Sequence, residues 1–579
     1  MIEITRRSDV DLSLLPDNIP PLLKRIYISR GISDISQLQR GAKGLLPFQK
    51  LWGIEKAVEL LFDAICQNQR IIVVGDFDAD GATSSALSVL ALRALGSGNV
   101  DYLVPNRFED GYGLSPEVVE QAIGMGAEVI MTVDNGVSSI EGVRLAKEKG
   151  LKVIVTDHHL PGSVLPEADA MVNPNLNECG FPSKALAGVG VAFYLMLALR
   201  ATMRDKGFFA QNGTSEPNLA ELLDLVALGT VADVVALDEN NRILVHQGLQ
   251  RIRAGKGRPG IQALIEVSKR SAQRMVAADF GFALGPRINA AGRLDDMSFG
   301  VELLMCNNIH AARRMASELD GLNQTRKEIE EGMKQEAIAF CERLQFGDTS
   351  ALPYGLVLFQ RDWHQGVIGI LASRIKDQFH RPVIAFADGG DGLIKGSCRS
   401  VPGLHMRDTL DIVDKQHPGM ILKFGGHAMA AGLTIAEKDR ERFSQAFDLS
   451  VREQLNESAL KGVILSDGEL QPEELSMHTA QLLRDSGPWG QAFPEPLFDG
   501  EFKILHQKLV GEKHLKLMVE PLFKGLPTNI TLDAIKFNID LRRWPDASVK
   551  TAHIAYRLDI NEFRGNQSLQ LMVEHIEAK

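Results

Sequence analysis

The fold of this chain is decided by one stretch, residues 71–85, which reads I-I-V-V-G-D-F-D-A-D-G-A-T-S-S. Four apolar residues lead into a glycine, and three carboxylates then follow at alternate positions, Asp76, Asp78 and Asp80. This pattern predicts a buried strand, a loop and the start of a helix, as in an open α/β sheet. Because neighbouring carboxylates repel one another, we expect a cation in this loop. The simpler alternative is a solvated acidic turn, or a helix cap made by Asp80.

Strand and helix patterns alternate regularly after this stretch. Strands are predicted at 71–74, 100–104, 129–133, 153–156 and 170–172, and helices at 84–95, 116–125 and 138–149. Such alternation predicts an α/β fold with a parallel sheet and helices on both faces.

Polar side chains follow the ends of these predicted strands. Asp134 follows the third strand, Asp157-His-His159 follows the fourth, and Asp233 comes later among apolar neighbours, where a capped turn is the alternative. Because parallel strands end at one edge of a sheet, we expect these groups to meet there. The candidate metal ligands are Asp76, Asp78, Asp80, Asp134, His158 and Asp233.

This ligand set is rich in oxygen and lacks thiolates, so it suits Mg²⁺ or Mn²⁺. The acids are too many for one ion, and we expect two ions about 3.5–4 Å apart, bridged by Asp134. That arrangement favours phosphoester hydrolysis. His159, if it is not a ligand, could protonate the leaving oxygen or stabilise the developing charge. His159, Asp134 and Asp157 are the candidate catalytic residues.

The rest of the chain predicts three further parts. A long connecting helix is expected at 306–348, a second α/β domain at 349–465, and a small oligonucleotide-binding (OB)-like β-barrel at 466–579. Residues 1–50 are expected to form a helical lead-in to a first domain at 51–305. In the second domain, Gly425-Gly-His427 predicts an anion cradle at the start of a small-residue helix, although tight helix packing would need the same residues.

Basic and aromatic residues are interleaved in the predicted barrel and could track phosphates and stack bases. They are Lys508, Lys513, Lys516, Lys536, Phe537, Arg542, Arg543 and Trp544. A merely solvated strand face is the alternative. The formal net charge of −11 argues against coating nucleic acid by bulk charge, but it allows a local basic groove.

Composition places the chain among ordinary globular proteins, with 45% hydrophobic and 24% charged residues. Its five cysteines are scattered, without a Cys-x-x-Cys pair, which fits a reducing, cytoplasmic compartment. No apolar run reaches the roughly 18–20 residues of a membrane span, so no membrane association is expected.

The ordered motifs resemble the DHH phosphoesterase superfamily. They are Gly75-Asp-Phe-Asp-Ala-Asp-Gly81, Asp134-Asn-Gly136 and Asp157-His-His159, and Gly425–Gly432 resembles the glycine-rich motif of the associated DHHA1 domain. The barrel and the segments 105–115, 285–293 and 363–374 narrow the resemblance to single-strand-specific 5′→3′ DNA exonucleases of that superfamily.

The resemblance implies a hydrolase that releases 5′-mononucleotides from single-stranded DNA in recombination and mismatch repair. It also implies a single-strand-binding protein and a RecQ-type helicase as partners. The implied metal ligands are the six named above. The resemblance also implies phosphate or DNA contact by Arg287, Arg293, Arg374, Ser397, Arg399 and His427. Arg107, Asn289, His364 and Gly426 complete the set of candidate substrate-binding residues.

Two other functions stay open. A phosphodiesterase or pyrophosphatase of the same superfamily that acts on small nucleotides would use the same metal chemistry, but it would need no barrel. A DNA-binding scaffold without activity would not need the complete set of carboxylates and histidines.

Overall fold

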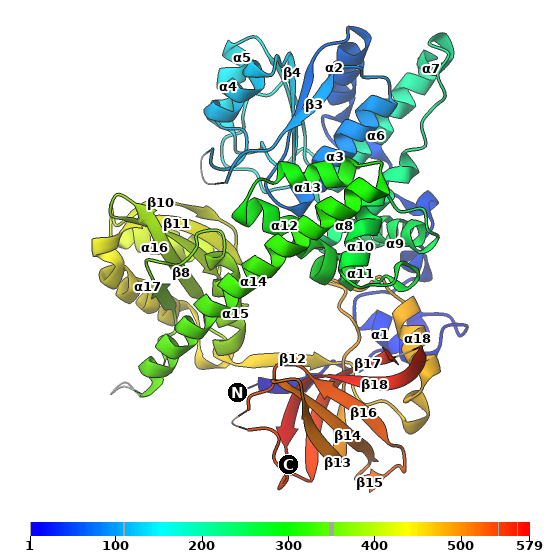
Figure 1. Cartoon of the computed structure of the whole chain (residues 1–579), viewed down its shortest axis with the longest axis vertical. Helices are drawn as coiled ribbons and strands as arrows, with labels where there is room; N and C mark the ends of the chain where they lie inside the picture. Colours follow the sequence, from blue (N-terminus) through cyan, green and yellow to red (C-terminus); the bar gives the residue numbers. More distant parts are fainter. Residues whose placement is uncertain (1, 108–109, 347–351, 542, 564) are drawn as a thin grey trace. The chain divides into compact units, whose positions relative to one another are not determined.

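The computed structural model describes residues 2–107, 110–346, 352–541, 543–563 and 565–579 (Figure 1). The chain forms two compact units. The smaller unit contains Gly321–Ile464 and the first residues up to Thr5, and the larger unit contains Arg6–Asp320 and Leu465–Lys579. Within the described residues, no helix combines the length and the apolar character needed to cross a membrane.

The larger unit is built on a five-stranded parallel sheet. Its strands lie in the order β3-β2-β4-β5-β6, and they are β2 (Ile71–Val74), β3 (Val100–Leu103), β4 (Val129–Val133), β5 (Lys152–Thr156) and β6 (Ala170–Val172). Every residue of β2 and β4 is buried. These strands read as continuous apolar runs because both faces of a parallel sheet are covered. The predicted parallel sheet is confirmed, with each strand within one residue of its expected bounds.

The helices of this unit form two layers. On one side α4 (Pro116–Gly124) packs against α5 (Ile140–Glu148), and on the other α3 (Ala79–Ala94) packs against α6 (Gly188–Asp205) and α8 (Leu223–Ala232). The chain moves from β2 outward to β3 and then returns to the opposite side of β2 with β4. At such a reversal of strand order the connections leave on opposite faces and open a crevice at the carboxyl ends of the strands.

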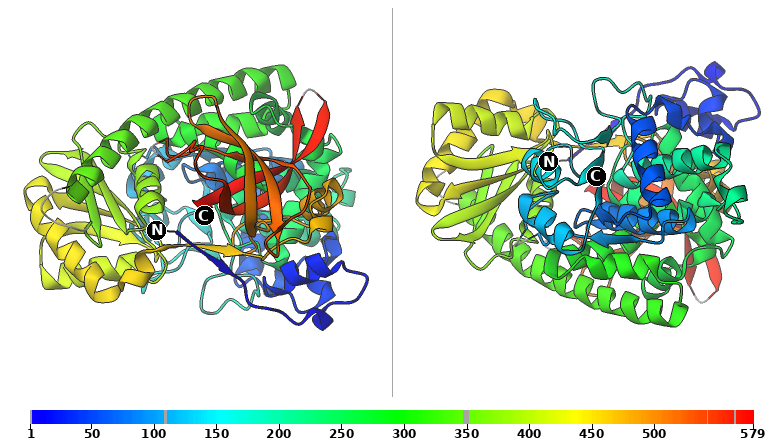
Figure 2. Two further views of the ribbon diagram at one scale, coloured as in Figure 1. Left: turned by 90° about the horizontal axis from the view of Figure 1, so that it is seen from below. Right: turned by 90° about the horizontal axis from the view of Figure 1, so that it is seen from above.

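The predicted connecting helix is present as α14 (Ile309–Phe346). It continues from the larger unit into the smaller one, and both views of Figure 2 show it as one unbroken green helix.

The smaller unit is the predicted second α/β domain. Its mixed sheet has the order β10-β11-β9-β8-β7, formed by β7 (Leu356–Phe359), β8 (Val383–Gly390), β9 (Leu393–Arg399), β10 (Ile421–Gly426) and β11 (Ala430–Ala436). The helices of the unit are α15 (Ile368–Phe379), α16 (Met406–Gln416) and α17 (Arg440–Gln454). Phe386, Phe443 and Phe447 fill the core with ring contacts.

The helix predicted after Gly425-Gly-His427 is wrong. These residues end β10 and turn into β11, which pairs in register with β9. Burial along this segment follows a period of two, since Ala431, Leu433 and Ile435 are buried while the residues between them are less so. A period of two is typical of a strand, and the abundance of alanine and glycine hid it.

The C-terminal part forms the predicted barrel. The pairings β13–β17–β18–β16–β14 close into a ring through a β13–β14 pairing. The strands are β13 (Phe498–Val510), β14 (His514–Phe523), β16 (Leu532–Lys536), β17 (Thr551–Phe563) and β18 (Asn566–Ala578), with the short β15 (Leu526–Pro527) beside β14.

The helical lead-in expected at 1–50 is only partly correct. It contains α1 (Pro21–Ile28) and several 3-10 turns, but it begins with the strand β1 (Ile2–Arg6), which pairs with β12 (Gly462–Ser466). The alternation of Ile2, Glu3 and Ile4 is a strand pattern.

Candidate metal centre

The centre lies at the reversal of strand order, where the ends of neighbouring strands come together. Val74 of β2 pairs with Thr132 of β4, Val133 of β4 pairs with Thr156 of β5, and Thr156 pairs with Val172 of β6. The polar residues that follow these strands therefore meet at one edge of the sheet, as the sequence predicts.

The acidic loop after β2 is held by its own main chain. Asp78 caps α3, because its Oδ1 accepts hydrogen bonds from the N–H groups of Asp80 (2.9 Å) and Gly81 (3.0 Å). The helix cap suggested for Asp80 is thus made by Asp78. Asp80 instead accepts from the N–H groups of Gly188 (2.6 Å) and Val189 (3.0 Å), the first residues of α6. A helix N-terminus stabilises such a negative charge.

Asp134 follows β4 in a left-handed backbone conformation, with φ 63°. It is 1% exposed, and its Oδ1 makes no hydrogen bond. Gly188 permits α6 to start directly against it, since a Cβ at Gly188 would lie 2.5 Å from the Asp134 Cβ. The Asp134 carboxylate is therefore buried in the crevice, and its Oδ1 remains available as a metal ligand.

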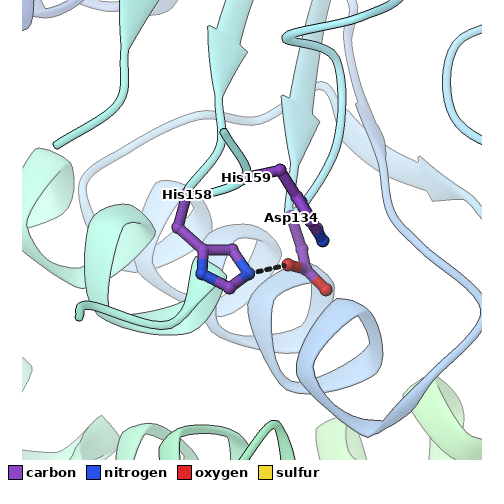
Figure 3. Close-up of side chains that lie close together, drawn as sticks. All are labelled: Asp134, His158 and His159. Carbon is purple, nitrogen blue, oxygen red and sulfur yellow. Dashed lines mark ion pairs between the residues drawn. The ribbon is translucent and has the colours of Figure 1, made fainter. Parts of the chain in front are cut away.

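The two neighbouring histidines have different partners, and Figure 3 shows the contact between His158 and Asp134. The Nε2 of His158 lies 3.1 Å from Asp134 Oδ1 and 3.4 Å from Asp233 Oδ2, yet it makes no hydrogen bond. Burial, together with the neighbouring His159, lowers the pKa of His158 to about 4. A neutral imidazole with an unused ring nitrogen among carboxylates is suited to bind a metal.

His159 is held by Asp157. Its Nδ1 lies 2.7 Å from Asp157 Oδ1, which also accepts from the main-chain N–H of both histidines. Burial alone would lower the pKa of His159, but the hydrogen bond with Asp157 and the nearby carboxylates raise it to about 9. Burial likewise acts to raise the pKa of Asp157, but the bond with His159 brings it below its ordinary value. The pair is a positioned imidazolium and carboxylate.

Asp233 enters from the end of α8. Val234, the next residue, has φ 62°, a rare conformation for a β-branched residue. Such strain persists where the surrounding structure demands it, often at functional sites.

The donor atoms of the described residues fall into three overlapping groups. Within each group all donor atoms lie within 4.8 Å of one another, and the groups are Asp76–Asp78–Asp134, Asp80–His158–Asp233 and Asp134–His158–His159. All six predicted ligands are brought together, and Asp134 belongs to two groups. The oxygen and imidazole donors, two of them with unused buried atoms, fit divalent ions such as Mg²⁺ or Mn²⁺.

The electrostatics also require a cation. Burial and the charge of Asp78 raise the pKa of Asp76 to about 8 and that of Asp80 to about 7. Burial and the other carboxylates raise the pKa values of Asp134 and Asp233 well above the ordinary range. Since four carboxylates cannot all ionise here unaided, a bound cation would stabilise the ionised cluster.

Two asparagines hold the main chain of the histidines by hydrogen bonds, a role that the sequence does not predict. Nδ2 of Asn173 donates to the His159 carbonyl (2.8 Å), and Nδ2 of Asn175 donates to the His158 carbonyl (2.5 Å). The only indication in the sequence is their place just after β6. They fix the main chain that carries both imidazoles.

The predicted substrate-binding residues of the larger unit lie around the acidic loop. Arg107 stacks over the Phe77 ring at 4.0 Å and donates to the Gly292 carbonyl. Asn289 accepts from the Ala79 N–H at 2.8 Å and so holds the start of α3. Arg287 points to Asp320, with Nε 2.8 Å from its carboxylate. Arg293 lies on the same helix, α12 (Gly285–Leu294).

In the smaller unit, Ser397 and Arg399 of β9 lie under the start of α15. Arg399 donates to Ser397 Oγ (3.2 Å) and Ser373 Oγ (3.1 Å). A Cβ at Gly369 would lie only 2.9 Å from Ser397 Oγ and 3.0 Å from the Arg399 guanidinium, so the glycine permits their close approach to α15. The other candidates of this unit occupy separate places. Arg374 pairs with Glu330 of α14, His364 accepts from the Gly366 N–H, and Gly426 and His427 form the hairpin turn between β10 and β11.

The basic and aromatic residues predicted to lie along the barrel are partly engaged by the barrel itself. Lys516 pairs with Asp533, Lys536 donates to the Glu574 carbonyl, and Trp544 is buried. Phe537 is 46% exposed, whereas Arg542 lies outside the described residues. Of the predicted residues, Lys508, Lys513 and Arg543 are exposed.

Comparison with known proteins finds matches along almost the entire chain. The family model of the DHH family, N-terminal domain, matches residues 70–230, that of the DHHA1 domain matches 353–453, and that of the RecJ OB domain matches 466–575. The single-stranded-DNA-specific exonuclease RecJ of Escherichia coli (strain K12) is 62% identical over 575 residues, which cover 99% of each chain.

Solved structures give the same result. RecJ from Thermus thermophilus in complex with Mn²⁺ matches with a TM-score of 0.80 at 28% identity, over 100% of this chain and 80% of that one. The complex of the same protein with Mg²⁺ matches with a TM-score of 0.74 at 27% identity, over 100% and 79%. With three domains matched in order and 62% identity over nearly its full length, the chain belongs to the RecJ family of the DHH superfamily.

Proposed function

We propose that this protein is a metal-dependent exonuclease that degrades single-stranded DNA from the 5′ end and releases 5′-mononucleotides. The observation that carries this proposal is the buried cluster of carboxylates and imidazoles at the reversal of strand order. The name of the E. coli relative, a single-stranded-DNA-specific exonuclease, supports the substrate, and the T. thermophilus complexes support Mn²⁺ or Mg²⁺ as the ion. The direction and the product come from the motif resemblance.

We infer a pair of ions in the centre. One would be held by the group of Asp76, Asp78 and Asp134, and the other by the group of Asp80, His158 and Asp233. Asp134 is our candidate for the bridging ligand. When bound, such a pair activates water and neutralises charge that develops on the phosphate.

The catalytic role of the second histidine follows from its partner. His159 holds a proton on a ring that Asp157 orients. We infer that it donates this proton to the leaving oxygen, as a general acid does.

We propose that the candidate substrate-binding residues contact the phosphates of the strand, with Ser397 and Arg399 as the most organised pair. The domains proposed are 1–50 (lead-in), 51–305 (DHH), 306–348 (connecting helix), 349–465 (DHHA1) and 466–579 (OB-like, nucleic-acid-binding). A role in recombination and mismatch repair in the cytoplasm, with a single-strand-binding protein and a RecQ-type helicase as partners, is proposed from the resemblance.

The test uses oligonucleotides labelled at the 5′ or the 3′ end, as single strands and as blunt duplexes, with Mn²⁺, Mg²⁺ or EDTA. We expect immediate release of labelled mononucleotide from the 5′ end of single strands only, and none with EDTA. Hydrolysis of pyrophosphate or short dinucleotides without DNA degradation would contradict the proposal and favour the small-nucleotide alternative.

Metal binding should depend on pH. Without metal, the pKa values of Asp76 and Asp80 are raised to about 8 and about 7, so protons compete with the ion below those values. In the unfolded chain these carboxyl groups have their ordinary pKa of about 4. Because folding raises the two pKa values, the free energy of unfolding of the metal-free protein decreases as pH rises from about 4 through 7 to 8. We therefore expect Mn²⁺ to raise the melting temperature more at pH 8 than at pH 6, as measured by thermal unfolding with Mn²⁺ and with EDTA. An equal rise at both pH values would contradict this.

Asn175→Ala should weaken metal binding without unfolding the protein. The substitution removes the hydrogen bond that fixes the His158 carbonyl, and the loss of such supporting contacts typically costs about 10–100-fold in metal affinity or activity. Titration calorimetry with Mn²⁺ measures the change. Asn212→Ala, which alters an exposed asparagine at the end of the short helix α7 (Phe208–Gln211), is the control and should leave the affinity unchanged.

A further inference from the structure

Tyr112 stands at the rim of the metal centre with half of its surface open to solvent. Tyr112 is 51% exposed, and its hydroxyl lies 3.5 Å from Nε2 of His159. The other ring nitrogen of His159, Nδ1, is the one that contacts Asp157. A single exposed aromatic residue is ordinary on a protein surface. Tyr112 differs because it contacts a residue of the metal centre directly.

The ring is held from two sides. It meets the Phe77 ring edge to face, with the ring centres 5.8 Å apart and the planes at 75°, and the His159 ring at 6.1 Å and 87°. Phe77 lies between the candidate ligands Asp76 and Asp78 in the sequence. The Arg107 guanidinium stacks over its ring, 4.0 Å from the ring centre. Tyr112 is therefore a supported aromatic surface, which can bind a ligand at a low cost in conformational entropy.

The main chain around Tyr112 is shaped to present it. Gly111 and Gly113 both have positive φ, 83° and 73°, which other residues rarely adopt. Leu114 is buried and anchors the far side, with its N–H donating to Ser139 Oγ at 3.1 Å. The turn thus places the ring outward while its base stays fixed.

We propose that Tyr112 is the stacking surface for the nucleobase of the nucleotide being removed. This inference rests on the proposed function, because a phosphate held at the metal centre brings the adjoining base to the rim. Stacking suits a nuclease that degrades any sequence, since every base has a π-face. A hydrogen-bonding side chain at this place would instead select among bases.

The test is a double-mutant cycle in which the Tyr112 ring and a base of the DNA are removed separately and together. Wild type, Tyr112→Ala, Tyr112→Phe and Trp52→Ala are compared on single strands that are intact or that lack the base at the first, second or third nucleotide from the degraded end. Trp52 is 49% exposed and supplies a control matched in exposure. Melting temperatures with and without Mn²⁺ show whether each variant is folded and binds metal.

On intact strands, Tyr112→Ala should lose about 5- to 150-fold in kcat/KM, the range for one base stacked on an aromatic ring. On the strand that lacks the contacted base, it should degrade as fast as wild type. Tyr112→Phe and Trp52→Ala should stay close to wild type on all strands.

An equal loss on intact and abasic strands would overturn the inference. So would a Tyr112→Phe loss as large as that of Tyr112→Ala, because the hydroxyl contact with His159 would then be the role of Tyr112. In both cases the proposed exonuclease function stands. If wild type degrades no single strand at all, the proposed function fails and this inference fails with it.

Discussion

Asp134→Asn is expected to abolish DNA degradation, with a loss of about 10³-fold or more in kcat. Asp134 belongs to two of the three donor groups and has an unused, buried oxygen. Its loss therefore weakens the whole cluster. Bound divalent ions contribute several kcal/mol to phosphoester hydrolysis, and each 1.4 kcal/mol changes the rate tenfold.

Asparagine is the informative replacement at this position. Asp134 has φ 63°, a conformation that asparagine adopts more readily than alanine. The space is also tight, since Gly188 packs directly against the side chain. The asparagine variant would keep both shape and backbone while removing one ligand charge, so a loss of activity could not be ascribed to misfolding.

Degradation of a labelled single strand with Mn²⁺ measures the effect, with thermal unfolding as the measure of folding. Asp101→Asn is the matched control, because Asp101 lies on the neighbouring strand β3 and pairs with Arg70 outside the cluster. It should retain wild-type activity. An Asp134→Asn protein that degrades DNA within tenfold of wild type would exclude the bridging role.

The parallel sheet and the metal cluster could be predicted from the sequence because both follow from local patterns. Apolar runs such as 71–74 identify buried strands, and parallel strands necessarily end at one edge. Carboxylates placed directly after those strands therefore meet, whatever the details of packing. Asp233 was a weaker prediction because it enters from a helix end, where a capped turn would look the same in sequence.

The supporting roles of residues around the centre could not be predicted, because these roles depend on distant contacts. Asn289 holds the Ala79 N–H, a partner 210 positions away in sequence. Asn175 holds His158 through a strand order that the sequence does not specify. Tyr112 lies between two glycines in a loop, a pattern shared by many turns. The 430–436 strand was missed because small residues suit helices and strands alike.

Substitutions of the two adjacent histidines are expected to have large but different effects. His158 offers an unused Nε2 among Asp134 and Asp233, and its lowered pKa keeps it neutral. His159 is bonded to Asp157 and has a raised pKa, which keeps it protonated. We therefore expect His158 to bind metal and His159 to supply a proton, although they are neighbours in sequence.

The variants His158→Ala and His159→Asn test this division of roles. His158→Ala should weaken Mn²⁺ binding strongly and recover part of its activity at high Mn²⁺. In His159→Asn, the side-chain amide can still donate to Asp157, but the acidic proton is absent. It should bind Mn²⁺ almost as wild type does and lose about 10²- to 10⁴-fold in kcat, the usual contribution of a general acid.

The pH dependence of the rate distinguishes a proton donor from a structural residue. Because a general acid must be protonated, wild-type kcat should fall as pH rises through the pKa of His159, which the hydrogen bond with Asp157 raises above its ordinary value. His159→Asn should lack this decline, since it has no titrating group at that position. Calorimetry with Mn²⁺ completes the comparison: if both variants lose metal binding equally, then His159 is a ligand, and the proton for the leaving oxygen must come from another group.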